Sequence, residues 1–314
     1  MQLKDKRVLV TGCSGVIGRV LVERLVQTGA QVLGIDIVPE SRPIKEVGYL
    51  TADLASGPPK TAIDFAPEAV FHLAASFGRT IETAGYWKTV FDNDVLASHR
   101  LLEAVEALQS LRVFVFASSY LNYSPGLYLD VPQVRRLKES DQLLPRNLVG
   151  LAKYYMDREL DFVQTTQRNF RAISARIYRV YGRGSRDVIS RWVRAALAGE
   201  VLTVFGRDNC FDYVYADDIA EGLARLAETK EAVGAVNLGS GKARSIADVL
   251  QILNSKIGGI RTRIEPEQLP IESSCADMTL FRHLTGWIPE TSLEAGIAKV
   301  VEYEKLRQYL ASTG

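Results

Sequence analysis

Residues 8–18 read Val-Leu-Val-Thr-Gly-Cys-Ser-Gly-Val-Ile-Gly, and this stretch decides the fold. Its first residues form an apolar segment of strand type, and apolar residues recur at helical spacing over residues 16–26. Gly12 permits a tight turn, Gly15 lets the backbone approach a pyrophosphate, and Gly18 lets the helix pack closely on the strand. The N-terminus of the helix then faces the anion. We therefore expect a dinucleotide site at this turn.

A carboxylate follows the next predicted strand. Residues 31–35 are apolar enough for a buried strand, and Asp36 stands directly after them. At this position of a βαβ unit a carboxylate accepts hydrogen bonds from the adenosine ribose, and its charge would repel a 2′-phosphate. The sequence therefore favours NAD over NADP.

Segments of strand and helix character alternate along the chain. Strands are predicted at residues 31–35, 69–73, 112–117, 172–176 and 202–205, and helices at 87–108, 148–165, 188–198, from 217, 245–254 and 293–303. Apolar strands alternating with helices are typical of a parallel sheet covered on both faces. The prediction is an α/β fold: a Rossmann-type doubly wound parallel sheet over residues 1–180 that binds NAD, and a smaller C-terminal α/β lobe over residues 181–314 that binds substrate. Some chain is expected to be exchanged between the lobes.

Charge and composition exclude several classes of protein. The 314 residues include 38 Lys and Arg against 37 Asp and Glu, which gives no electrostatic case for binding nucleic acid or an anionic membrane. The three cysteines and three histidines lack the spacing of a disulfide framework or a metal site. No apolar run approaches the length of a membrane span, and the first residues lead directly into a strand without a signal peptide. We expect a cytoplasmic protein that binds neither metal, nucleic acid nor membrane.

Motifs along nearly the whole chain resemble those of the extended short-chain dehydrogenase/reductase family, the NAD-dependent sugar epimerases and dehydratases. Besides the glycine turn, the matches are Asp53-Leu54, His72-Leu73-Ala74-Ala75, Phe116-Ala117-Ser118-Ser119, Val180-Tyr181-Gly182, the stretch 212–218, the stretch 237–241 and the stretch 285–289. So many matches in order are specific for fold and cofactor and less specific for substrate. The resemblance implies that NAD is held by Gly12, Gly15, Val16, Ile17, Gly18, Asp36, Asp53, Leu54, Leu73, Ala74, Ala75, Lys153 and Tyr178.

The reaction centre of that family contains a Ser or Thr, a Tyr, and a Lys four residues after the Tyr. The Lys ammonium and the nicotinamide charge lower the pKa of the phenol, which exchanges a proton with the substrate hydroxyl while hydride moves. Ser119 and Lys153 match two of these positions, but the Tyr position is Val149. The usual general base therefore cannot come from there. Ala152, where Ser is common, is a milder departure.

Three explanations for Val149 stay open. The chain binds NAD without performing chemistry; or another phenol replaces the missing one, with Tyr120 directly after Ser119 as the first candidate; or the substrate or a water supplies the acid or base and Lys153 transfers the proton. Each catalytic role has a plainer alternative. Tyr120 could be an aromatic side chain packed at the end of a strand, and Lys153 could bind the ribose without taking part in the chemistry. Other tyrosines near in sequence or in the expected site are Tyr123, Tyr128, Tyr154 and Tyr178.

A further polar position lies near the predicted reaction centre. Relatives commonly have an Asn there, and this chain has Asn93 followed by Asp94. The register of the helix decides which of the two points inward, and the sequence leaves that open.

The positions that bind substrate in relatives differ in this chain. Relatives that act on nucleotide diphosphate sugars grip the pyrophosphate through an Asn before Val-Tyr-Gly and through two arginines of the second lobe. Those positions are Arg179, Phe211 and, by an ungapped count, Glu267. Losing two guanidinium groups removes bidentate contacts to phosphate. The arginines expected to border the cleft are Arg179, Arg183, Arg186, Arg191 and Arg207.

As a group, these arginines favour an anionic, sugar-like small molecule as the substrate. Substrate contacts are predicted for Ser119, Tyr120, Arg179, Arg186 and Arg207. The sequence therefore predicts an NAD-dependent enzyme resembling the epimerases and dehydratases, acting on a sugar or nucleotide-sugar-like anion through a transient ketone. The alternative is a noncatalytic NAD-binding sensor or assembly protein. The resemblance also implies a homodimer that pairs the helices near residues 87–108 and 148–165.

Overall fold

The structure, a computed structural model, describes residues 1–76, 83–166, 169–266 and 270–313. Its largest element is a seven-stranded sheet in the order β3-β2-β1-β4-β5-β7-β11, in which every neighbouring pair is parallel. The strands are β1 (Arg7–Thr11), β2 (Gln31–Asp36), β3 (Gly48–Thr51), β4 (Ala69–His72), β5 (Val113–Ser119), β7 (Arg171–Ile177) and β11 (Gly234–Leu238). The chain changes direction across the sheet between β1 and β4, and open α/β sheets bind ligands beyond the carboxyl ends of the strands at such a point.

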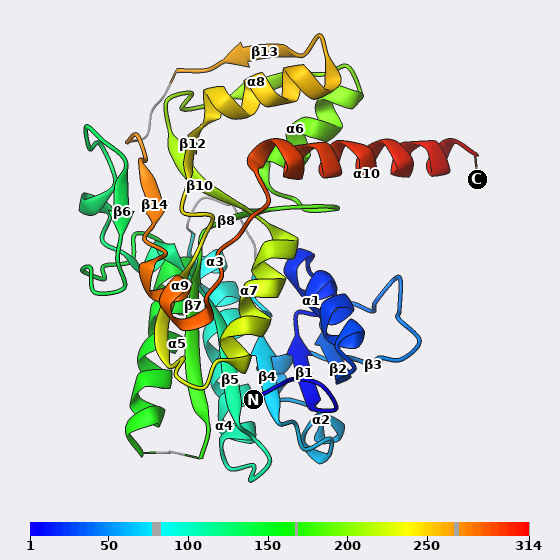
Figure 1. Ribbon diagram of the computed structural model, residues 1–314, viewed down its shortest axis with the longest axis vertical. Helices are drawn as coiled ribbons and strands as arrows, with labels where there is room; N and C mark the ends of the chain where they lie inside the picture. Colours follow the sequence, from blue (N-terminus) through cyan, green and yellow to red (C-terminus); the bar gives the residue numbers. More distant parts are fainter. Residues whose placement is uncertain (77–82, 167–168, 267–269, 314) are drawn as a thin grey trace.

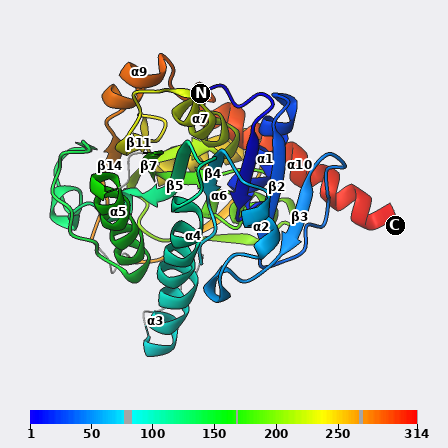
Figure 2. The ribbon, with the colours of Figure 1, turned by 90° about the horizontal axis from the view of Figure 1, so that it is seen from below.

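Helices cover both faces of this sheet (Figure 2). The helices of the two faces are α1 (Val16–Gln27), α7 (Ala216–Glu228) and α9 (Thr279–Thr285) on one, and α2 (Lys60–Asp64), α4 (Ala97–Glu106) and α5 (Leu148–Thr166) on the other. Successive strand residues alternate between the two cores: Val8 and Val10 face α1, whereas Leu9 faces the α4 side. Strands buried on both faces read as continuous apolar runs, which is why the sequence predicted a parallel sheet. The predicted α/β doubly wound class is confirmed.

The smaller lobe lies beyond the carboxyl ends of the strands of the large sheet (Figure 1). The chain enters it directly from the sheet, since β8 begins two residues after β7 ends. It contains a three-stranded sheet of β8 (Arg179–Tyr181), β10 (Cys210–Tyr215) and β12 (Ala243–Ser245), the strand pairs β9 (Val201–Val204) with β13 (Arg261–Ile264) and β6 (Arg135–Leu137) with β14 (Ser274–Ala276), and helices α6 (Val188–Leu197), α8 (Ile246–Ile257) and α10 (Leu293–Thr313). Trp192, Val249 and Ile297 belong to its separate apolar core.

The two units exchange chain. Strand β11 pairs with β7 in the large sheet, with Val236 opposite Ala175, and α7 packs against α1. Both elements follow the predicted boundary near residue 180, so the later part of the chain completes the nucleotide-binding sheet. Among the helices of the described ranges, none is both long and apolar enough to cross a membrane.

One predicted helix has an irregular centre. The segment expected to be helical over residues 87–108 consists of α3 (Ala84–Val90), a π-helical turn, η2 (Phe91–Leu96), and α4. A π-helical turn inserts an extra residue into the spiral and is frequent at functional sites. It changes which side chains point inward just where the reaction centre is expected.

Candidate active site

The glycine turn has the geometry that the spacing predicts. Gly12 has a φ of +68°, and a Cβ there would lie 2.7 Å from the backbone nitrogen of Ala74. A Cβ on Gly18 would lie 2.1 Å from the carbonyl oxygen of Gly12. Gly15 is the residue before α1, and Val16 and Ile17 form the first turn of that helix. The turn is therefore a cradle of backbone at a helix N-terminus, which fits a pyrophosphate.

Asp36 lies at the end of β2 and is fixed against this turn. Its Oδ2 accepts a hydrogen bond from the Ser14 amide at 2.9 Å, and its Oδ1 accepts one from the Val38 amide at 3.3 Å. The carboxylate is thus held beside the glycine turn, in the position for which the sequence predicts a contact with the adenosine ribose. The side chain of Asp53, in contrast, accepts a hydrogen bond from the Ala55 amide at 2.9 Å and caps a short 3₁₀ turn that buries Leu54.

Ser119 and Lys153 come from different elements next to the same edge of the sheet. Ser119 ends β5, and its Oγ accepts a hydrogen bond from the Leu121 amide at 3.2 Å. Lys153 is buried, with its Nζ 4.6 Å from the centre of the Phe116 ring. Burial lowers the pKa of Lys153, although the charges of Asp94 and Asp157 oppose the shift. Val149, one turn earlier on α5, is partly exposed.

Asp94 is a buried acidic group whose charge acts on Lys153. It is buried in the π-helical turn, whereas Asn93 is partly exposed, so the structure answers which of the two points inward. Its Oδ1 accepts the Ser76 amide hydrogen, and its Oδ2 has no hydrogen-bond partner among the described residues. Burial raises the pKa of Asp94, against the opposing effects of Lys153 and Ser76. Oppositely shifted groups of this kind are typical of proton-transfer sites.

Tyr120 lies in an aromatic stack. Its ring is parallel to that of Tyr178, with centroids 5.0 Å apart and an interplanar angle of 17°. Burial raises the pKa of Tyr120, and the charge of Arg179 only partly offsets this, so the phenol keeps its proton at neutral pH. The Tyr178 hydroxyl is buried and has no partner in the described parts of the chain. Of the other tyrosines, Tyr123 and Tyr128 are also buried, and Tyr154 packs against Arg158 on α5.

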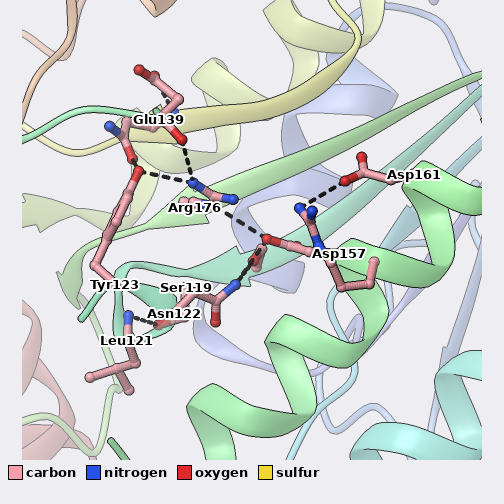
Figure 3. Close-up of polar contacts among 11 residues, drawn as sticks. Ser119, Leu121, Asn122, Tyr123, Glu139, Asp157, Asp161 and Arg176 are labelled. Carbon is pink, nitrogen blue, oxygen red and sulfur yellow. Dashed lines mark hydrogen bonds and ion pairs between the residues drawn. The ribbon is translucent and has the colours of Figure 1, made fainter. Parts of the chain in front are cut away.

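A buried polar network lies next to the end of β5 (Figure 3). The Arg176 guanidinium, on β7, donates to Asp157 at 3.2 Å and to the Tyr123 hydroxyl at 3.2 Å. Asn122 donates to the same Asp157 oxygen at 2.9 Å and to Ser118 at 3.1 Å. Its members join β5, β7 and α5, so the network fixes the backbone on either side of Ser119. No motif of the sequence indicates this network, although an arginine inside an apolar strand is a visible signal.

Two arginines meet at one carboxylate beyond Tyr120. The Nη2 atoms of Arg146 and Arg179 lie 2.6 Å and 3.2 Å from the same Oε2 of Glu272. Burial alone would raise the pKa of Glu272, but the charges of Arg179 and Arg146 outweigh it and hold that pKa below its ordinary value. The Arg179 guanidinium also lies 3.6 Å above the centre of the Phe211 ring. No motif of the sequence points to Arg146 or Glu272, because their contact spans 126 residues of sequence.

The remaining predicted arginines lie at the surface. Arg186 and Arg207 are exposed, and Arg183 pairs with Asp217 at 3.2 Å. Glu267 lies outside the described residues. Within the described ranges, no group of His, Cys, Asp and Glu side chains has the arrangement of a metal site.

Comparison with known proteins gives consistent matches. Residues 8–239 match the family model described as the NAD dependent epimerase/dehydratase family. The chain is 27% identical to a UDP-glucose 4-epimerase of Mycolicibacterium smegmatis, covering 95% of this chain and 98% of the relative, and 25% identical to a UDP-glucuronate 4-epimerase of Thermodesulfobacterium geofontis, covering 95% of each. Among solved structures, MoeE5 in complex with UDP-glucuronic acid and NAD superposes with a TM-score of 0.84 at 27% identity, covering 96% of this chain and 99% of that one.

Proposed function

The chain belongs to the NAD dependent epimerase/dehydratase family, and on that premise we propose that it oxidises a hydroxyl of an anionic, nucleotide-sugar-like substrate to a transient ketone. NAD, when bound, supplies the hydride acceptor and later the donor. One observation carries the proposal: the glycine cradle follows β1, Ser119 ends β5, and Lys153 packs on Phe116 of β5. All three therefore lie near the carboxyl ends of the two strands that flank β4, next to the point where the strand order reverses. The relatives named above support a nucleotide sugar, so UDP-glucose and UDP-glucuronic acid are the first candidates.

The proposed roles follow from the positions of the side chains. Ser119 hydrogen-bonds the reacting oxygen, and Lys153 holds the nicotinamide ribose and tunes the proton donor. Tyr120 is the proposed replacement for the phenol missing at Val149, as the donor that returns a proton to the ketone oxygen, because its raised pKa keeps it protonated. The proton of the substrate hydroxyl would pass to the amine of Lys153, whose pKa burial lowers. Arg179, Arg186 and Arg207 are the proposed substrate contacts. The other proposed cofactor contacts are Gly12, Gly15, Val16, Ile17, Gly18, Asp36, Asp53, Leu54, Leu73, Ala74, Ala75 and Tyr178.

An assay for a transient ketone tests the proposal. The purified protein is incubated with each candidate sugar in deuterated water and in the presence of NAD. Absorbance of the reduced cofactor and deuterium at substrate carbons are then followed. We expect a change in the sugar without net accumulation of NADH, read as an altered configuration or as solvent deuterium at a carbon next to the transient ketone, and we expect its loss in Lys153→Met. The hydride held on the nicotinamide does not itself exchange with water. Stoichiometric conversion of cofactor would instead identify a simple reductase. Unchanged turnover in Tyr120→Phe would remove Tyr120 from the reaction.

A noncatalytic NAD-binding protein is the second candidate, and Val149 is the observation that favours it. It predicts that NAD binds while no candidate sugar exchanges deuterium or changes configuration. Binding of NAD, measured by calorimetry, is therefore a required companion to the activity assay.

We also propose a homodimer formed by α5 and the α3–η2 segment. Large apolar side chains are exposed on these elements, namely Trp87, Phe91, Leu151, Tyr155 and Phe162. Contiguous exposed apolar surface marks interaction sites. Light scattering is expected to give twice the chain mass, and Phe162→Asp is expected to give the monomer.

A further inference from the structure

Two guanidinium groups are held side by side next to the proposed reaction centre. Arg146 precedes α5, Arg179 opens β8, and Glu272 lies just before β14. Because both arginines donate to the same Glu272 oxygen, their positive charges are fixed close together. Tyr120, the residue directly after Ser119, lies beneath them, with the Arg179 guanidinium 6.0 Å from its ring centre.

The carboxylate of this triad is covered, and the guanidinium groups are not. The Glu272 side chain is 4% exposed, whereas those of Arg146 and Arg179 are 24% and 27% exposed. The second oxygen of Glu272 accepts a hydrogen bond from the Ser274 hydroxyl at 2.8 Å. Both oxygens of this buried carboxylate therefore accept hydrogen bonds from the protein. The two arginines therefore form the side of the triad that a ligand can reach.

Most of the donors on these arginines have no acceptor among the described residues. A guanidinium carries five N–H groups, and the described residues accept one hydrogen bond from each arginine, both at Glu272. The Arg179 Nε is buried and has no partner in those residues, and the same holds for the Tyr128 hydroxyl. A buried donor without a partner calls for an explanation, and a ligand that accepts its hydrogen supplies one.

The charges of the triad do not cancel. Glu272 is ionised because the arginines hold its pKa below the ordinary value, and two guanidinium charges against one carboxylate leave one positive charge. Phe211, Tyr128 and the neutral Tyr120 phenol surround it with aromatic rings. Low polarity around the charge strengthens its attraction for an anion. Paired guanidinium forks match the oxygens of a carboxylate.

We propose that Arg146 and Arg179, held in register by Glu272, bind a carboxylate on the sugar ring of the substrate, so that the protein selects acidic sugars over neutral ones. This rests on the proposed function, because Ser119 must mark the sugar end of the substrate. Since Tyr120 follows Ser119 directly, the paired guanidinium groups lie at that end of the site. Glu272 is a positioning residue, and the arginines make the contact.

Calorimetry on the NAD-loaded protein tests the assignment with three probes: UDP-glucuronic acid, UDP-glucose and UDP. We expect the acidic sugar to bind at least about tenfold more tightly than the neutral sugar, since charge-assisted hydrogen bonds are the stronger class. Arg146→Met and Arg179→Met are expected to remove this difference, because each weakens binding of UDP-glucuronic acid more than binding of UDP-glucose. Arg146→Lys keeps the positive charge but lacks the paired donors of a guanidinium, and it is expected to retain part of the preference for the acidic sugar. The matched control is Arg263→Met, an exposed arginine on β13 that pairs with Glu265.

Each other result overturns the inference in a recognisable way. Equal affinity for the two sugars in the unmodified protein would refute acid selection alone, because nucleotide-sugar binding would still stand. Weakened binding of UDP in both methionine variants would assign the arginines to the diphosphate and refute the carboxylate contact. Failure of all three probes to bind would refute the proposed function together with the inference. Thermal unfolding of each variant shows that a lost preference comes from a folded protein.

Discussion

The carboxylate of Asp36 gives a direct test of how the dinucleotide is chosen. Asp36→Ala removes the acceptor that lies at the end of β2 against the glycine turn, and Asp36→Asn keeps an acceptor for the Ser14 amide but removes the charge. A hydrogen bond to a charged group contributes about 1.5–3 kcal/mol, so loss of the ribose contact is expected to weaken NAD binding about tenfold to a hundredfold. Removing a negative charge about 4 Å from a 2′-phosphate is worth about 1–4 kcal/mol in favour of NADP.

Together these effects are expected to lower the preference for NAD over NADP by at least about a hundredfold. Calorimetric titration of both dinucleotides into both variants measures the ratio, with Asp64→Asn, an exposed carboxylate on α2, as the matched control. Circular dichroism confirms that the variants fold. The reasoning is refuted when both variants keep the original ratio within about twofold, because Asp36 would then contribute only to the loop.

Three further changes test the surroundings of the site. Gly18→Ala places a Cβ 2.1 Å from a backbone oxygen of the turn and is expected to abolish NAD binding and lower the melting temperature, whereas Gly85→Ala, with no atom closer than 4.0 Å, is expected to do neither. Burial lowers the pKa of His72 to about 3. As the pH falls through about 6.5, this imidazole therefore binds a proton in the unfolded chain but stays neutral in the folded chain. Stability is therefore lost as the pH falls, by about 2 kcal/mol between pH 7 and pH 5, and urea unfolding of His72→Asn should show that loss reduced by the same amount. Asp157→Asn leaves a buried guanidinium without its ion-pair partner and is expected to cost about 3–5 kcal/mol in urea unfolding, against less than about 1 kcal/mol for Asp161→Asn at the surface; equal costs would contradict a structural role for the network.

The elements with a clear local signal were predictable from the sequence. The helix expected over residues 16–26 is α1, and the strand expected over 112–117 is β5, which continues to Ser119. Both carry apolar residues at a period that the finished structure satisfies. Gly12 and Gly18 were predictable from their spacing in one βαβ unit, although the backbone that approaches Gly12 most closely is that of Ala74, after β4.

Contacts between distant segments were not predictable. Nothing local in the sequence brings Arg146 or Arg179 to Glu272, because the meeting depends on how the second lobe docks. The inward direction of Asp94 depends on a π-helical turn, which a regular helical period does not describe. The positions of Lys153 and Val149 were predicted from a motif, but only the packed structure shows how burial and nearby carboxylates act on the lysine.

Strand β11 has a consequence for synthesis of the protein. It closes the outer edge of β7 and is made about sixty residues after that strand, following most of the smaller lobe. During translation β7 therefore exposes an unpaired row of backbone amides and carbonyls, the kind of edge that attracts other chains. That edge stays unpaired until residues 234–238 have left the ribosome. For the same reason, the first 180 residues expressed by themselves are expected to aggregate instead of forming a minimal NAD-binding domain.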